Sequence, residues 1–187
     1  MLPANRRTAY VSNAMDYMTD LSWRERFEKD DTAGLKRLGM KVEKLDLREF
    51  FGQKERLREE VAGCGVVWVS GGNTFVLRQA FKLSGLDEIL LASVKRDFVY
   101  GGYSAGICIL APTLKGIAPM DDPAAKPYGE VEVIWDGLGL LDYSIVPHHK
   151  SDHPETKAAS RAAEYMAANG MPFRTLRDGE AIITEVT

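Results

Sequence analysis

The sequence predicts one α/β domain over residues 1–187, a three-layer sandwich in which helices cover both faces of a mostly parallel sheet. Strand-like and helix-like segments alternate along the chain, as they do in successive βαβ units. The run 66–69 is apolar without interruption, as expected of a parallel strand that is covered on both faces. Two strand-like runs end in glycine-rich turns, and ligand sites in such sheets lie beyond the carboxyl ends of the strands.

The composition favours a globular protein that acts on a small molecule. Hydrophobic residues make up 45% of the chain, and the net charge of -3 comes from interleaved acids and bases, with no basic face for nucleic acid or a membrane surface. No apolar stretch reaches the about 18 residues of a membrane span. Cys64 and Cys108 adjoin apolar runs without C-x-x-C spacing, which indicates buried thiols in a reducing compartment. We therefore expect a cytoplasmic protein without a cofactor or metal.

Turn and capping signals divide the first half of the chain. The S-x-x-E sequence from Ser22 to Glu25 predicts a helix start, and Gly39 predicts its end. The large apolar residues of this helix recur at roughly helical spacing, at Trp23, Phe27, Leu35 and Leu38. The other elements predicted before residue 98 are strands over 8–11, 40–45 and 66–69 and helices over 57–62 and 75–82.

The second half contains a long irregular stretch between regular elements. Residues 113–130 are rich in proline and glycine, which predicts a loop near the site or over it. The Asp178-Gly179 dipeptide lies between two short β-prone runs and predicts a hairpin. The elements predicted here are strands over 98–100, 131–135, 143–146, 173–176 and 180–184 and a helix over 154–168.

A G-x-S-x-G pattern follows the strand 98–100, with glycines at 102 and 106 around Ser104. A serine on a sharp strand-to-helix turn projects its hydroxyl away from the backbone, and flanking glycines remove the side chains that would collide there. Ser104 is therefore a candidate nucleophile, and the free N–H of Ala105 at the helix start is a candidate oxyanion donor. The alternative is an ordinary Gly-Gly turn, since short matches of this kind also arise by chance.

The second glycine-rich turn is Ser70-Gly71-Gly72-Asn73, directly after the strand 66–69. Asn73 or Thr74 can cap the following helix, which leaves the amides of Gly71 and Gly72 free to face a ligand or an oxyanion. A phosphate cradle is weakly supported, because the pattern matches neither of the glycine-rich nucleotide motifs. A tight turn that only needs positive φ is an equally good explanation of either glycine.

All three histidines lie close together, at 148, 149 and 153. His148 follows the strand 143–146, so its imidazole emerges at the same sheet edge as Ser104 and is the candidate base. A zinc site is the rival interpretation, but the spacing is neither H-x-x-x-H nor H-E-x-x-H. The acid that orients the imidazole is either Asp178 or a residue of the pair Asp121 and Asp122, and Asp178 can also be a simple turn residue.

These motifs resemble those of the S51 peptidases, the dipeptidase E or aspartyl dipeptidase family. The matching segments, in the same order and at similar spacing, are Ser70-Gly71-Gly72-Asn73-Thr74-Phe75, Gly102-Tyr103-Ser104-Ala105-Gly106, Pro112-Thr113 and Pro147-His148. The resemblance extends from about Thr8 to Ile183. It implies a class I glutamine amidotransferase-like, flavodoxin-like fold with a serine in place of that group's cysteine.

The resemblance also implies roles for individual residues. Ser104 matches the family's nucleophile, His148 its general base, and Gly71, Gly72 and Ala105 its oxyanion donors. Family acids have been proposed at positions that match Asp121 and Asp178, so the third member stays open. In the aspartate-specific members a cationic side chain receives the substrate carboxylate, and the nearest matches here are Lys157 and, as a second choice, Lys150.

The chain departs from the family pattern in three places. Ser70 replaces the first glycine of G-G-G-N-T-F, the strand-helix unit expected before the strand 8–11 is missing, and the chain stops soon after Ile183. The missing unit predicts an open sheet edge, which either a second copy covers in a homo-dimer or an incomplete gene product leaves bare.

The expected function is a serine peptidase that hydrolyses dipeptides or short peptides through a Ser-His-Asp triad. Nucleic acid and membranes are not expected partners. An esterase of the α/β-hydrolase kind and a non-catalytic binding module on the same scaffold are the alternatives. In the esterase the chain order Ser, Asp, His would require Asp121, and 187 residues is short for that fold.

Overall fold

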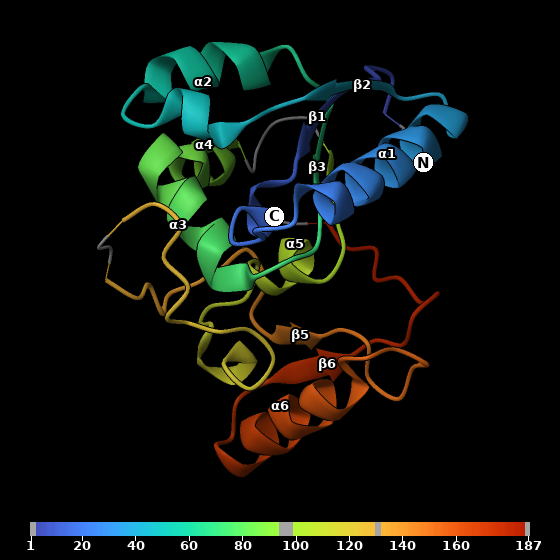
Figure 1. Cartoon of the computed structure of the whole chain (residues 1–187), viewed down its shortest axis with the longest axis vertical. Coiled ribbons are helices and arrows are strands. Elements are labelled where there is room, and N and C mark those ends of the chain that lie inside the picture. Colours follow the sequence, from blue (N-terminus) through green and yellow to red (C-terminus); the bar gives the residue numbers. More distant parts are fainter. Residues whose placement is uncertain (1–2, 94–98, 130–131, 186–187) are drawn as a thin grey trace.

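A four-stranded parallel sheet forms the centre of the protein in a computed structural model that describes residues 3–93, 99–129 and 132–185 (Figure 1). Its strands are β1 (Arg7–Val11), β2 (Lys41–Lys44), β3 (Val66–Val69) and β4 (Val99–Gly102), in the order β2-β1-β3-β4. The parallel register pairs Ala9 with Val67 and Val67 with Tyr100. The predicted parallel α/β fold is therefore confirmed. β2 and β4 are the outer strands, and pairing of an outer strand with a second subunit stays a prediction.

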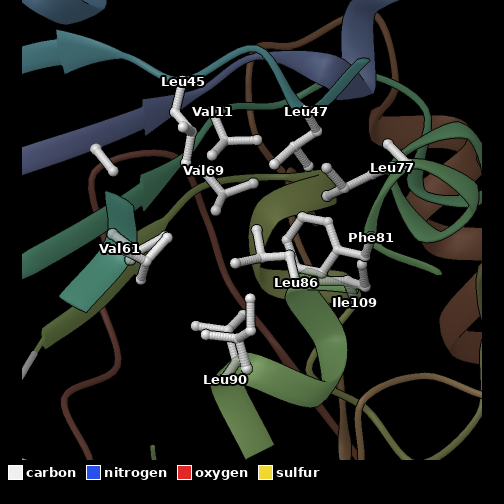
Figure 2. Close-up of a cluster of buried hydrophobic side chains, with 14 of the residues drawn as sticks. Val11, Leu45, Leu47, Val61, Val69, Leu77, Phe81, Leu86, Leu90 and Ile109 are labelled. Carbon is white, nitrogen blue, oxygen red and sulfur yellow. The ribbon is translucent and has the colours of Figure 1, made fainter. Parts of the chain in front are cut away.

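Helices and short 3-10 turns connect the strands on both faces of the sheet. They are η1 (Asn13–Met15), α1 (Leu21–Arg37), η2 (Leu47–Phe50), α2 (Lys54–Ala62), α3 (Thr74–Ser84), α4 (Leu86–Ser93) and α5 (Ala105–Cys108). α1 packs on one face, where Leu35 contacts a cluster with Tyr10 and Val66. α2, α3, α4 and α5 pack on the other face and enclose the main core (Figure 2). Three layers result, as the sequence predicts.

The main core is built from alternate strand residues and one face of each helix. Figure 2 shows Val11 and Val69 of adjacent strands pointing toward Leu77 and Phe81 of α3. All four of these side chains are fully buried, so each contributes about 1.5–3 kcal/mol by leaving water. This apolar contact fixes the carboxyl ends of β1 and β3 against the middle of α3.

A second, smaller unit lies at the opposite end of the molecule from α2 (Figure 1). It contains η3 (Lys115–Ile117), β5 (Ser144–Val146), α6 (Thr156–Ala168) and β6 (Phe173–Thr175), and β5 and β6 pair in parallel. Ile117, Val146 and Met166 share a buried cluster with Cys108 of α5. α5 therefore joins the two units.

Several sequence predictions for this half are wrong. Residues 180–184 form no strand and so no hairpin partner for β6, which pairs with β5 instead. In the predicted strand 131–135, Val131 lies outside the described residues and 132–135 form none; only Asp136 makes an isolated bridge, to Thr113. Phe98 of the predicted strand 98–100 also lies outside the described residues. Among the described residues neither segment pairs continuously with another strand, although the Trp135 carbonyl accepts a hydrogen bond from the Leu114 N–H.

The first helix differs from the prediction at its start and on its apolar face. Asp20 is the N-cap and its carboxylate accepts a hydrogen bond from the Ser22 N–H, so the S-x-x-E box does not form the cap. Only Leu35 of the spaced apolar residues is buried, while Trp23 and Phe27 are 53% and 42% exposed. The sequence analysis also missed α4. Among the described residues, no helix has the length and apolar character needed to cross a membrane.

Candidate active site

Ser104 occupies a sharp turn between β4 and α5, and its backbone has a φ of 48° and a ψ of -119°. A positive φ is unfavourable for a residue with a Cβ, so the surrounding structure must hold the Ser104 backbone in this conformation. The close packing of the two flanking glycines does so. A Cβ on Gly102 or Gly106 would lie 2.5 Å or 2.3 Å from the carbonyl oxygen of Val69, so only glycine lets the turn pack on the end of β3.

The turn after β3 lies against this serine. A Cβ built on Gly71 would be 3.1 Å from the Cβ of Ser104, so the two glycine-rich turns are in direct contact. Asn73 is the helix cap, since its Oδ1 accepts hydrogen bonds from the N–H groups of Phe75 (2.8 Å) and Val76 (3.0 Å). In the described part of the chain the N–H groups of Gly72 and Ala105 donate to no other group. Both amides are therefore available beside the serine.

Asp121 is tied to the same turn from the loop 113–129. Its Oδ2 accepts from the N–H of Thr74 (2.9 Å) and from the Thr74 hydroxyl (2.5 Å). Asn73 Nδ2 donates to the carbonyl of Asp122 at 2.9 Å and anchors the next residue of the loop. Burial raises the pKa of Asp121 to about 6, and its hydrogen bonds with Thr74 oppose this rise. The carboxylate of Asp121 is thus bonded to Thr74 and not to the histidine.

His148 follows β5 and bonds to Asp178, which follows β6. The distance from His148 Nδ1 to Asp178 Oδ1 is 2.7 Å, and the imidazole is largely buried whereas the carboxylate is 46% exposed. The Ser151 hydroxyl oxygen accepts a hydrogen bond from the Asp178 N–H at 2.8 Å and fixes the turn. An ionised carboxylate can only accept, so the proton of a neutral imidazole resides on Nδ1 and Nε2 keeps its lone pair.

Two residues that the sequence analysis gave no role also surround this imidazole. The ring of His153 stacks on that of His148 with centroids 3.8 Å apart and planes 10° from parallel. Glu155 Oε2 is 3.8 Å from His148 Nε2, and its N–H donates to Nδ1 of His153 at 3.2 Å. The crowding of histidines was visible in the sequence, but the carboxylate near Nε2 depends on how the chain turns into α6.

His148, His153 and Asp178 also form a group whose potential ligand atoms all lie within 4.8 Å of one another. Two ligands of a tetrahedral zinc ion lie about 3.3 Å apart, given zinc bond lengths of about 2.0–2.2 Å. The 2.7 Å pair of His148 and Asp178 is a direct hydrogen bond, and the lone pairs of two nearly parallel rings do not converge on one point. The arrangement fits a hydrogen-bonded base better than a zinc site.

The structure does not bring all of the predicted site residues into contact. Across the described residues, no hydrogen bond joins the Ser104 hydroxyl to His148, whose imidazole bonds to Asp178. Lys157 is exposed near the start of α6, and neither it nor Lys150 forms an ion pair within the described ranges. The structure thus brings together Ser104 with Gly71 and His148 with Asp178, as two separate pairs.

Comparisons with known proteins identify a family for this chain. The family model described as Peptidase family S51 matches residues 3–186. An uncharacterized peptidase of Listeria monocytogenes is 34% identical over 119 residues, which is 63% of this chain and 55% of the relative. A peptidase E of Streptomyces coelicolor is 32% identical over 124 residues, 64% of this chain and 48% of the relative. The chain spans about half the length of such curated relatives.

A solved structure shows the same fold. A crystal structure of a protein described as a peptidase E, from Listeria monocytogenes EGD-e, superposes with a TM-score of 0.73 at 22% sequence identity. The match covers 100% of this chain and 89% of the crystallised chain. This likeness supports the class I glutamine amidotransferase-like architecture predicted from the sequence.

Proposed function

Because the chain belongs to peptidase family S51, we propose that it is a serine peptidase that hydrolyses dipeptides or short peptides through an acyl-enzyme. The observation that carries the proposal is the turn at Ser104. It holds a serine at positive φ against the Gly71-Gly72 turn, with two free amides beside it. A purely structural turn has no use for such strain, whereas an exposed nucleophile next to oxyanion donors requires it.

In the proposed reaction Ser104 Oγ attacks the scissile carbonyl carbon while His148 Nε2 takes the hydroxyl proton. The amides of Gly72 and Ala105 donate to the oxyanion that develops on the carbonyl oxygen. His148 then passes the proton to the leaving amine, and a water molecule repeats the attack on the acyl-enzyme. The serine-to-histidine hydrogen bond is expected to close when substrate binds, as catalytic hydrogen bonds often do.

Asp178 is the proposed orienting acid. Its 2.7 Å contact with Nδ1 supports this role, because it selects the tautomer that leaves Nε2 free to accept the serine proton. Asp121 has a different proposed role. Its bonds to Thr74 support a function in holding the Gly71-Gly72 turn, and they disfavour the esterase alternative, which would need Asp121 as the triad acid.

A fluorophosphonate probe tests the nucleophile. We expect covalent labelling of Ser104, measured by mass spectrometry of peptides, and hydrolysis of small dipeptides by the same preparation. Ser104→Ala should abolish both, whereas the control Ser160→Ala on α6 should leave both unchanged. Equal labelling of the Ser104→Ala variant would contradict the proposal, and a folded wild-type protein that is neither labelled nor active would favour the non-catalytic binding module.

A further inference from the structure

Tyr103, which precedes the proposed nucleophile, connects the glycine turn to α1. Its hydroxyl donates a hydrogen bond to Asp31 Oδ2 at 2.8 Å. Its ring fills the space beside Gly71, where a Cβ would lie 2.7 Å from Tyr103 Cε2. Because Ser104 and Tyr103 are consecutive, this side chain links the nucleophile, the oxyanion turn and a helix on the other face of the sheet.

Asp31 accepts from a second phenol. Tyr10 of β1 donates to the same Oδ2 at 2.8 Å, and its side chain is almost completely buried. Burial, followed by the charge of Asp31, raises the pKa of each tyrosine, so both phenols keep their protons across the neutral range. One carboxylate oxygen of Asp31 therefore accepts two hydrogen bonds of equal length, one from Tyr10 and one from Tyr103. Removing either hydroxyl breaks one of these bonds, so Tyr10→Phe and Tyr103→Phe form a matched pair of variants.

The hydrogen bond to Asp31 fixes the position of the Tyr103 ring, and that ring packs directly on Gly71. Because glycine has no side chain, the backbone of Gly71 lies against the ring with no other atoms between them. A ring that is held at its hydroxyl therefore limits how far the backbone of the Gly71-Gly72 turn can move.

We propose that Asp31 is a positioning residue, which holds the Tyr103 ring against Gly71 and so fixes the Gly71-Gly72 turn beside Ser104. This inference rests on the proposed function for its effect on catalysis. Its geometric part, the packing of the Tyr103 ring on Gly71, does not. Tyr10 shares the carboxylate but not the contact with Gly71, so removing its hydroxyl tests the fold without testing the turn.

The experiment compares Tyr103→Phe with Tyr10→Phe in the full chain. Each change removes one phenol bond to Asp31, so the two variants should lose similar thermal stability. Tyr103→Phe should lower both kcat for a dipeptide and the rate constant of fluorophosphonate labelling by about tenfold or more, with KM within about twofold. In Tyr10→Phe, kcat and the rate constant of labelling should both stay within about twofold of the wild-type values. Asp31→Ala should lose turnover, and Asp31→Asn, whose amide oxygen can still accept, should recover part of it.

Hydrogen exchange of the Gly71 amide, followed by NMR, gives a readout that does not need activity. Exchange should accelerate by about tenfold or more in Tyr103→Phe and remain unchanged in Tyr10→Phe, because only the former frees the ring that packs on Gly71. Unchanged Gly71 exchange in Tyr103→Phe would overturn the inference, as would equal losses of turnover in the two variants. A wild-type protein that resists labelling would instead overturn the proposed function, while the exchange result still decides the geometry.

Discussion

The two halves of the candidate site are built in different ways. The nucleophile half lies on the four-stranded sheet, where buried backbone at the ends of β3 and β4 holds Ser104. The base half lies on the two-stranded sheet, where side chains after β5 and β6 hold His148. Asp178 and Glu155 are 46% and 44% exposed, unlike the closely packed glycines of the other half.

This difference predicts which kind of substitution each half of the site will not tolerate. Backbone packing leaves no room for a new atom, whereas an exposed side-chain pair tolerates new atoms but depends on its chemical groups. α5 joins the halves, since Cys108 Sγ lies 3.5 Å from the carbonyl of Ile145 in β5 as a weak donor. Burial keeps the pKa of this thiol well above its usual value, so Cys108 acts as a packing residue.

The largest expected effect is on the base half. Asp178→Asn keeps the size of the side chain but removes the charge that selects the Nδ1–H tautomer, so kcat should fall by about 100-fold to 10,000-fold with little change in KM. Global stability should change little, because Asp178 is half exposed. Steady-state kinetics on a dipeptide measure this effect.

Asp121→Asn is the matched control for Asp178→Asn, because an asparagine oxygen can still accept from Thr74. Its kcat should stay within about tenfold of the wild type. A large loss of kcat in Asp121→Asn together with a nearly normal kcat in Asp178→Asn would show that Asp121 is the orienting acid. Asp178 would then be a turn residue only.

The nucleophile half should show the next largest effect, in stability. Gly106→Ala places a Cβ 2.3 Å from the carbonyl oxygen of Val69, and relief requires a backbone shift that costs about 2–3 kcal/mol. The control Gly179→Ala, in the base half, has positive φ but no atom within 4 Å, so about 1 kcal/mol is expected. Chemical denaturation measures both. Equal losses would show that the two halves are packed alike.

The partly buried acid Asp121 should give a pH-dependent effect. Its pKa is about 6 in the folded protein, against 3.8 for the free group, so between these values the folded state holds a proton that the unfolded state has lost. Stability therefore falls as pH rises through this window, by up to about 1.4 kcal/mol per pH unit.

Asp121→Asn removes this titration. The stability of the wild type relative to Asp121→Asn should decline from pH 4 to pH 6 and level off above it. The raised pKa of Asp31 acts in the same direction but is common to both proteins, so it cancels in the difference. A difference that is constant with pH would contradict the burial of Asp121 in solution.

The smallest effect is expected from Lys157. This lysine is exposed, and a solvated ammonium cannot form the paired hydrogen bonds that an arginine gives a carboxylate. We expect kcat/KM for Asp-Leu to exceed that for Asn-Leu and Ala-Leu by less than about tenfold, and Lys157→Ala to remove that preference. A preference above about a hundredfold, or about 2.7 kcal/mol, would show a dedicated carboxylate site.

The sequence by itself determined the features that depend on local chemistry. The apolar run 66–69 indicated a buried parallel strand, and Asn73 was identified as one of two candidate caps because its side chain reaches N–H groups two and three residues ahead. Gly102 and Gly106 marked a turn that a Cβ would block. Such features are encoded within a few residues, so single-sequence reasoning reaches them.

Only the tertiary structure decided between candidates that are far apart in the chain. Asp121 and Asp178 were both candidates in the sequence, with Asp178 favoured. Packing of the loop 113–129 places the Asp121 carboxylate on Thr74, and pairing of β5 with β6 places that of Asp178 on His148. β6 pairs with β5, which lies 27 or more residues earlier in the chain, so the β propensity of residues 180–184 could not indicate this pairing. Asp31 reaches Tyr103 across 72 residues for the same reason, since hydrogen bonds between distant residues depend on the whole fold.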